Sequence, residues 1–421
     1  LGEHGTADGE RLLRIGVWHV VVGKAELPER PRAGHAGHPR GRRYVDPQPI
    51  RAWHTRAADG QTEGAGGTVV GGETTLPLDE RWVFPPPHAA PHVAFCVAHY
   101  PRRYYQSGMV IDAYAHVFPM RLIEALAEVK PSAELAALRA QSKHNWEHER
   151  RLAYMDEHGF DVQVLILARP PVWLGMERAD IHRLTRVANE SIAEFAARRP
   201  DRFVGVGVMP VVDDVMMQEF ERLHGELGLK GVLIFSNIEG KPLDDSSMWP
   251  LYERAAALDF PIWIHPQHAS YYPWIRKDVL DRVLAWPFDT SLAMARLVYG
   301  GVFERYPNIK FVTHHMGGMI PYFAARIAAF AETSAEEYAR LGLGESGPRL
   351  SGAPLDHFRR FYNDCISNGS PDSLRMALDF FGPDHLMFGT DFPFGPDEGE
   401  RWPLDELRNL RTVPLDEAVR E

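Results

Sequence analysis

Along most of this chain, apolar residues occur in short runs that alternate with longer stretches of mixed apolar and polar positions. The short runs are rich in Val, Ile, Leu and Phe, which is typical of buried strands. The longer stretches repeat their apolar positions with the period of an α-helix. We therefore predict eight strands, at residues 110–113, 162–167, 203–209, 231–235, 261–264, 309–313, 361–366 and 385–388. We predict helices between most of them, for example at residues 181–198, 216–227, 249–258, 292–304 and 373–381.

This alternation predicts the fold class. Short apolar strands separated by helices indicate an α/β protein whose parallel sheet is covered on both sides. Eight such units are the number that closes a (β/α)8 TIM barrel. An open, doubly wound sheet is the alternative. The pattern begins abruptly at Met109, so we expect the barrel to occupy residues 109–421.

Residues 1–108 have a different character. They are crowded with Pro, Gly, Arg and His, and stretches such as 29–43 and 57–72 show neither helical nor strand periodicity. We expect a largely disordered N-terminal extension, which we interpret as upstream sequence or as a segment that folding does not need.

The overall composition narrows the function classes. Apolar residues make up 45% of the chain and charged residues 24%, which is ordinary for a globular enzyme with a large core. The net charge of −11 argues against a nucleic-acid partner. No apolar run is long enough to predict a membrane span, and residues 1–22 lack the apolar centre of an export signal. Two cysteines cannot form a disulfide framework, so we expect the reducing cytoplasm.

Four predicted strands end in residues that can carry chemistry. His116 follows the first strand, His265 the fifth, His314 and His315 the sixth, and Asp391 the eighth. A single histidine after a strand is more often a hydrogen-bonded structural residue than a ligand. In a barrel, however, the carboxyl ends of all the strands meet at one face, where active sites lie. Neutral imidazole and carboxylate together are a ligand set for Zn, Mn or Fe, so the pattern predicts a divalent metal.

Four motifs at these strand ends resemble one family. They are IDAYAH at 111–116, PIWIHP at 261–266, HHMGGMIP at 314–321 and FGTDFP at 388–393. In order and spacing they resemble the amidohydrolase superfamily, within it the branch of aminocarboxymuconate semialdehyde decarboxylase and the hydroxybenzoate decarboxylases. The resemblance implies a metal-dependent barrel and a homodimer. It implies metal ligands at His116, His265 and Asp391, with zinc first and manganese second, and catalytic roles for His315 and Asp391.

One position departs from the family pattern. The first strand of the family usually carries His-x-His or Glu-x-His, whereas this chain has Tyr114 two residues before His116. A phenol with a reference pKa near 10 is a poor metal ligand at neutral pH. Two interpretations follow: Tyr114 lines the pocket and leaves three protein ligands plus water, or the metal is weakly held or lost.

Further residues are candidates for binding the substrate. Strand neighbours point to opposite faces, so we expect His315 to face the barrel mouth and His314 to pack or hydrogen-bond behind the strand. Besides Tyr114, the candidates for substrate contact are Asn237 after strand four, Trp286 in an aromatic segment, and Arg296 and Arg326 as partners of a carboxylate. For the two arginines, a structural ion pair is the competing interpretation.

The resulting functional hypothesis is a carboxy-lyase that acts on a small aromatic or unsaturated carboxylate. A hydrolase of a lactone, amide or ester would use the same residues, with metal-bound water as the nucleophile. The third alternative is a degenerate barrel that binds without catalysis, and Tyr114 keeps that alternative open. We predict no nucleic-acid partner and no membrane partner.

Overall fold

The computed structural model describes residues 11–15, 18–22, 109–131, 142–167, 175–267, 273–331, 335–342 and 350–413. The first two ranges are the antiparallel strands β1 (Arg11–Ile15) and β2 (Trp18–Val22). The disorder that we expected for the rest of residues 1–108 concerns positions outside the described residues.

From residue 109 onward most of the described strands form two parallel sheets, and β8 (Asn237–Ile238) and β9 (Lys241–Pro242) form a separate antiparallel hairpin. One has the order β3-β4-β5 and the other the order β13-β12-β11-β10-β7-β6. The strands are β3 (Ile111–Val117), β4 (Val162–Leu167), β5 (Phe203–Gly205), β6 (Gly207–Val208), β7 (Val232–Phe235), β10 (Ile262–His265), β11 (Phe311–Thr313), β12 (Tyr362–Asp364) and β13 (Leu386–Met387).

Backbone hydrogen bonds join the two sheets at both edges. The segment that carries β5 and β6 bridges them, because Val206 N donates to Leu165 O at 2.9 Å and Gly207 N donates to Gly231 O at 3.0 Å. At the other edge, Ala113 N donates to Phe388 O at 2.8 Å. The strands therefore follow one another in chain order and meet again at β3, which is the predicted (β/α)8 arrangement.

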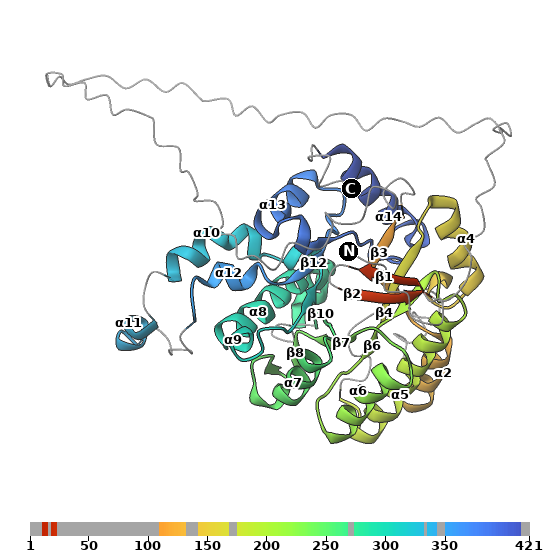
Figure 1. Ribbon diagram of the computed structural model, residues 1–421, viewed down its shortest axis with the longest axis horizontal. Helices are drawn as coiled ribbons and strands as arrows, with labels where there is room; N and C mark the ends of the chain where they lie inside the picture. The colour runs from red at the N-terminus through yellow and green to blue at the C-terminus, as the bar shows by residue number, and fades with distance from the viewer. Residues whose placement is uncertain are drawn as a thin grey trace, which may run out of the picture. The chain divides into compact units, whose positions relative to one another are not determined.

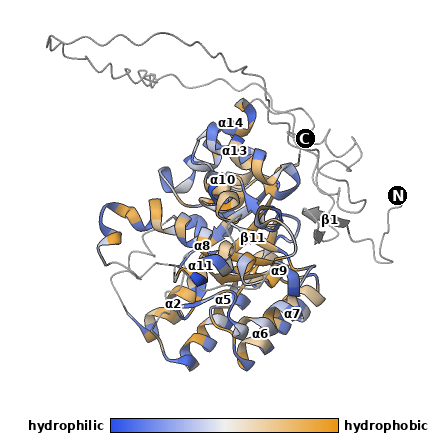
Figure 2. Ribbon diagram, turned by 90° about the vertical axis from the view of Figure 1, so that its left-hand side faces the viewer, coloured by the Kyte–Doolittle hydropathy of each residue, from blue (hydrophilic) through white to orange (hydrophobic). Residues whose placement is uncertain are grey.

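Helices cover the outside of these strands (Figure 1). On α6, the buried residues Met216, Phe220 and Leu223 fall on one face, as the 3.6-residue period requires. Figure 2 shows the same division on the outer helices, where apolar and polar residues alternate. The helices are α2 (Met120–Val129), α4 (His148–His158), α5 (Arg178–Ala197), α6 (Asp214–Gly225), α7 (Trp249–Ala257), α8 (Trp286–Tyr299), α9 (Val302–Arg305), α10 (Ile320–Ala331), α11 (Ala335–Arg340), α12 (Pro354–Phe358), α13 (Pro371–Phe381) and α14 (Arg401–Thr412).

Local sequence signals fix several helix ends. The side chain of Asp213 accepts a hydrogen bond from Met216 N and so caps α6, and Ser370 caps α13 in the same way. Gly159 ends α4 with a φ of 79°, a left-handed conformation that glycine adopts without strain. Among the helices that the structure describes, none combines the length and the hydrophobicity that crossing a membrane requires.

Candidate metal and catalytic site

The carboxyl ends of the strands bring four of the predicted site residues together. His116 lies within β3 and His265 ends β10, while His315 and Asp391 follow β11 and β13. His116 Nε2 lies 2.9 Å from Asp391 Oδ1, a hydrogen bond between side chains 275 residues apart. The His116 and His265 rings lie 5.6 Å apart between centroids. The strands therefore bring these four side chains to one face, as their positions at strand ends led us to expect.

His265 is held as a neutral imidazole. Its Nδ1 lies 2.8 Å from Pro266 O, which makes Nδ1 the protonated nitrogen because a carbonyl can only accept. Burial, together with the neighbouring His116, lowers the pKa of His265 to about 3. Its Nε2 thus carries a lone pair at neutral pH, as a metal ligand must.

His315 is paired with Asp364, a buried carboxylate at the end of β12. The His315 backbone N lies 2.9 Å from both Asp364 carboxylate oxygens, and His315 Nδ1 lies 3.6 Å from Asp364 Oδ1. Burial alone would lower the pKa of His315, but the Asp364 carboxylate outweighs it and the net pKa is raised. His315 can therefore carry a proton where His265 does not.

The backbone is strained at both proposed catalytic residues. His315 has a φ of 50° and Asp391 a φ of 60°, left-handed values that are uncommon away from glycine. The chain stays left-handed through Met316 to Gly318. A Cβ on Gly317 would come within 2.6 Å of Phe381, so this tight turn needs glycine. Such conformations cost about 1 to 3 kcal/mol each and cluster at functional sites.

The expected placement of His314 behind the strand is wrong. Its ring lies 4.2 Å from the ring of His315 and 6.0 Å from the ring of His265, measured between centroids. It does hydrogen-bond, since Thr290 Oγ1 on α8 lies 2.8 Å from its Nδ1. His314 itself is still extended, with a φ of −96° and a ψ of 158°, and the left-handed turn begins one residue later, at His315. The two rings therefore lie side by side, although alternation along a strand would place them on opposite faces.

Two of the four residues can be reached from solvent. The side chains of His315 and Asp391 are 22% and 16% exposed, whereas that of His116 is 1% exposed. Burial would raise the pKa of Asp391, but its hydrogen bond from His116 and the nearby imidazoles hold the pKa below its usual value. Asp391 is therefore an ionised carboxylate that a substrate or a cation can approach.

These donors fit a divalent metal by type. Two imidazoles and an ionised carboxylate are ligands of Zn and Mn, and His116 Nε2 and Asp391 Oδ1 already converge. Within the described ranges, no three His, Cys, Asp or Glu side chains stand in an arrangement that would hold a metal as they are. The fit thus rests on the donor set and on the convergence of its first two members.

Comparison with known proteins decides the family. The family model described as amidohydrolase matches residues 111–421. The chain belongs to the amidohydrolase family. This confirms the resemblance that the four motifs suggested.

Relatives of this amidohydrolase are decarboxylases by name. It is 30% identical over 265 residues to 2-amino-3-carboxymuconate-6-semialdehyde decarboxylase of Dictyostelium discoideum, covering 62% of this chain and 68% of that one. It is 31% identical over 265 residues to gamma-resorcylate decarboxylase of a Polaromonas species, covering 58% of this chain and 77% of that one.

Solved structures show the same relationship. The structure of 5-carboxyvanillate decarboxylase from Sphingomonas paucimobilis matches with a TM-score of 0.63 and 26% identity, covering 74% of this chain and 95% of that one. A dihydroxybenzoic acid decarboxylase from a Polaromonas species matches with a TM-score of 0.59 and 26% identity, covering 74% and 93%. That protein holds manganese and an inhibitor, 2-nitroresorcinol.

The other predicted residues of the amidohydrolase divide into two groups. Tyr114 and Trp286 are at the site, with ring centroids 5.3 Å from His116 and 5.7 Å from His265, respectively. Asn237 instead accepts a hydrogen bond from Gly240 N within the hairpin of β8 (Asn237–Ile238) and β9 (Lys241–Pro242).

The two arginines also have other contacts. Arg296 pairs through two nitrogens with Asp244, and it lies ten residues after Trp286 on α8, roughly 15 Å along the helix axis. The guanidinium of Arg326 lies over the ring of Phe330, at 4.7 Å. We leave Asn237, Arg296 and Arg326 out of the proposed site.

Two buried residues that support the proposed site, Asp364 and Arg151, were not predicted from the sequence. Asp364 could have been found, because it follows the seventh apolar run and the strand-end argument applies there too. The fully buried Arg151 on α4 could not, since its position relative to β3 depends on packing. Arg151 donates to the carbonyl of His116 at 2.7 Å and to Gln163 Oε1, whose amide donates to Asp112.

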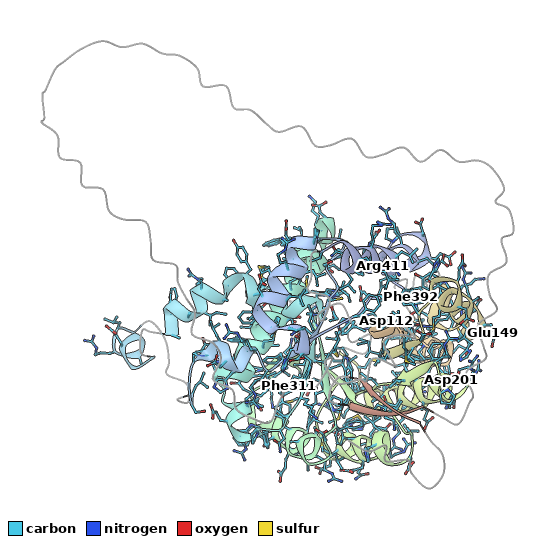
Figure 3. All side chains as sticks on the ribbon, turned by 45° about the horizontal axis from the view of Figure 1, so that its top comes forward. Asp112, Glu149, Asp201, Phe311, Phe392 and Arg411 are labelled. Atoms are coloured by element: carbon cyan, nitrogen blue, oxygen red, sulfur yellow. The ribbon has the colours of Figure 1, made fainter. Side chains whose placement is uncertain are left out.

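This buried network continues to the other end of the site. Thr390 Oγ1 donates to Asp112 Oδ2 at 2.6 Å and accepts from Phe392 N at 3.1 Å. Asp112 and Phe392 are both labelled in Figure 3. Burial raises the pKa of Asp112 to about 6, against the opposing effect of its hydrogen bonds. The network ties β3 to the segment that carries Asp391.

Proposed function

We propose that this amidohydrolase is a carboxy-lyase that removes carbon dioxide from a small aromatic or unsaturated carboxylate. We propose His116, His265 and Asp391 as ligands of a divalent metal and His315 as the proton donor. The proposal depends on one observation. At the face where barrel enzymes act, the His116–Asp391 pair lies near His315, and His315 is itself paired with the carboxylate of Asp364. The decarboxylase names of the relatives support the choice of reaction.

The metal, when bound, would offset negative charge on the oxygens of the substrate. The other steps fall to the side chains. The carbon–carbon bond to the carboxylate breaks, carbon dioxide leaves, and the electron pair remains on the carbon that carried it. That carbon takes a proton from the His315 imidazolium. Asp364 stabilises the imidazolium beforehand, and the partly exposed ring regains its proton from solvent.

His315 suits the donor role better than Asp391 does. The pKa of His315 is raised and that of Asp391 is lowered, so the imidazole keeps its proton to a higher pH than the carboxyl group does. An ionised Asp391 is correspondingly better suited to hold a cation. The two residues then have separate tasks.

The deciding experiment is a substrate panel with the purified full chain, loaded with Mn or Zn. We expect carbon dioxide release from at least one of 2,6-dihydroxybenzoate, 5-carboxyvanillate and 2-amino-3-carboxymuconate-6-semialdehyde. H315N, H265A and D391N should each lower the rate by about 100-fold or more. The matched control is H224A, since His224 is an exposed histidine on α6. Activity confined to lactones, amides or esters would establish the hydrolase alternative instead.

The proposal also covers which metal is bound, the oligomeric state of the protein and its location in the cell. The sequence favoured zinc, and manganese in a 26% identical structure supports manganese as the other candidate. Metal analysis of the purified protein distinguishes them. The homodimer and the cytoplasmic location stay predictions, to be checked by light scattering and by fractionation of the source cells.

A further inference from the structure

Asp289 is a buried carboxylate that has no part in the proposed reaction. It lies in the first turn of α8 and is 4% exposed. Carboxylates are rarely buried to this extent unless other groups pair with them. The partners of Asp289 come from two strand ends, because its Oδ2 accepts hydrogen bonds from Ser236 Oγ, directly after β7, and from the backbone N of Gln267, two residues after β10. Asp289 therefore joins α8 to the ends of two paired strands.

The N–H of Gln267 belongs to the peptide group that orients the His265 ring. A peptide group is planar and contains the carbonyl of one residue and the N–H of the next, so Pro266 O and Gln267 N lie in one rigid plane. His265 Nδ1 donates to Pro266 O at 2.8 Å, and Gln267 N donates to Asp289 Oδ2 at 3.0 Å. The carboxylate thus fixes the plane whose oxygen holds the imidazole.

Ser236 holds the same segment from the neighbouring strand. Its backbone N donates to His265 O at 3.0 Å, and its hydroxyl oxygen accepts from Gln267 N at 2.8 Å. The two acceptors of the Gln267 N–H, Ser236 Oγ and Asp289 Oδ2, are also hydrogen-bonded to each other. Both peptide groups that flank Pro266 are thereby anchored, and the segment cannot rotate without breaking these bonds.

Anchoring this peptide group fixes the nitrogen that His265 offers to a ligand. Since Nδ1 donates to Pro266 O, the lone pair of the neutral ring is on Nε2. Histidines that bind metals usually donate their other N–H to a carbonyl or a carboxylate, which holds the ring in place. A hydrogen bond accepted from a peptide N–H also polarises the carbonyl of that group and strengthens the bond that the carbonyl accepts.

We propose that Asp289 is a positioning residue for His265 and acts through the Pro266–Gln267 peptide group together with Ser236. The inference rests on the proposed function, in which His265 is a metal ligand, and adds a residue that touches neither metal nor substrate. Asp289 controls how tightly the metal is bound by holding one ligand in its binding orientation.

The first test is NMR spectroscopy of the metal-free full chain with isotope-labelled histidines, at about pH 8, above the ordinary pKa of histidine. The signals of His265 are identified by their absence from H265Q. We expect the wild type to show only the form protonated on Nδ1. D289L has a side chain of similar size that accepts no hydrogen bond, and it should show a mixture of the two neutral forms. D289N should resemble the wild type, because its amide oxygen can accept the same bonds.

The second test is calorimetric titration of the EDTA-treated full chain with Mn. We expect D289L to bind Mn about 10- to 100-fold more weakly than the wild type, and D289N to lose less than about 10-fold. S236A should change both measurements in the same direction as D289L. The matched control is E219Q, since Glu219 is a carboxylate on α6 that is 1% exposed and is bonded to Asn189 and Arg222. E219Q should bind Mn as the wild type does.

The inference is overturned if His265 keeps a single neutral form in D289L, or if D289L binds Mn as tightly as E219Q. It is also overturned if D289N is as impaired as D289L, because accepting hydrogen bonds would then not be the cause. If D289L does not fold, S236A decides by the same two measurements. Failure of the proposed function looks different, since the wild type then binds no Mn or releases no carbon dioxide, while the NMR comparison still tests Asp289.

Discussion

At the scale of single residues, the fully buried Arg151 makes several contacts behind the proposed site. Its guanidinium donates to the carbonyls of His116 and His144 and to Gln163, and it lies 4.9 Å from the ring centroid of Phe392. Burial lowers the pKa of Arg151 to about 9, so it stays charged at neutral pH. Its charge is partly balanced by the nearby Asp112.

Replacing this arginine should destabilise the barrel strongly. R151M leaves two buried carbonyls and the Gln163 side chain without their donor, and we expect the free energy of unfolding to fall by about 3 to 5 kcal/mol. Urea unfolding measures the change. The matched control is R183M, since Arg183 on α5 is 46% exposed and should contribute less than about 0.5 kcal/mol. Equal effects of the two substitutions would contradict the role of Arg151.

Because folding lowers the pKa of His265, we expect the free energy of unfolding of the metal-free protein to depend on pH. Its pKa is lowered from 6.5 to about 3 by folding, so the unfolded chain binds a proton that the folded chain does not. The stability that His265 contributes is present above pH 6.5 and is lost as the pH falls toward 3. Between pH 7 and pH 4 the wild type should lose roughly 3 kcal/mol more than H265Q.

Denaturation curves in EDTA at several pH values check this expectation. H224Q is the control, because His224 is an exposed histidine on α6, away from the site residues. Parallel pH profiles for wild type and H265Q would show that His265 is not held neutral by the fold.

At the scale of elements, the positions of the eight strands could be predicted from the sequence. Which side chains come together at the strand ends could be predicted only in part. Each predicted run overlaps an observed strand, because apolar composition and length identify a buried parallel strand without knowledge of its partners. The same argument placed His116, His265, His315 and Asp391 at one face. It did not place His314, because the chain turns left-handed one residue later, at His315, and this turn leaves no distinctive signal in the sequence.

Side chains outside the strand ends were harder to predict. Arg296, Arg326 and Asn237 carry polar groups that fit a substrate site as well as a surface contact, and only the fold shows which contact each makes. Arg151 sits on a helix far from the motifs in sequence. Its role depends on how α4 packs against β3, which hydrophobic periodicity does not specify.

A substitution at Gly389 tests how closely β12 and β3 pack where the barrel closes. A Cβ at this position would lie 2.8 Å from the Cβ of Asp364 and 3.0 Å from the Cβ of Tyr114, so G389A should push the end of β12 and β3 apart. We expect a loss of about 1 to 3 kcal/mol in stability, as for other overpacked cores, together with a lower kcat. G225A at the end of α6 is the control, since a Cβ there meets nothing within 4 Å. A G389A protein as stable and active as G225A would contradict this packing.

At the scale of the whole molecule, a metal that binds only the folded chain links the site to global stability. Binding adds RT ln(1 + [metal]/Kd) to the free energy of unfolding, about 2.7 kcal/mol at 100 times Kd. For a domain of this size we expect a rise in Tm of roughly 5 °C when Mn or Zn is added to EDTA-treated protein. Thermal unfolding followed by circular dichroism measures it.

Comparing the rise in Tm among variants shows where the metal binds, which the rise in the wild type alone does not. H265A and D391N should lose the shift because each removes a proposed ligand, whereas H224A should keep it. If the wild type and H265A respond equally, the metal binds elsewhere on the molecule. If no metal shifts the wild type, the barrel belongs with the non-catalytic alternative that Tyr114 raised. If the rise in Tm occurs only in proteins that retain His265 and Asp391, these two residues bind the metal. Metal binding at the strand ends would then stabilise the fold that brings the two residues together.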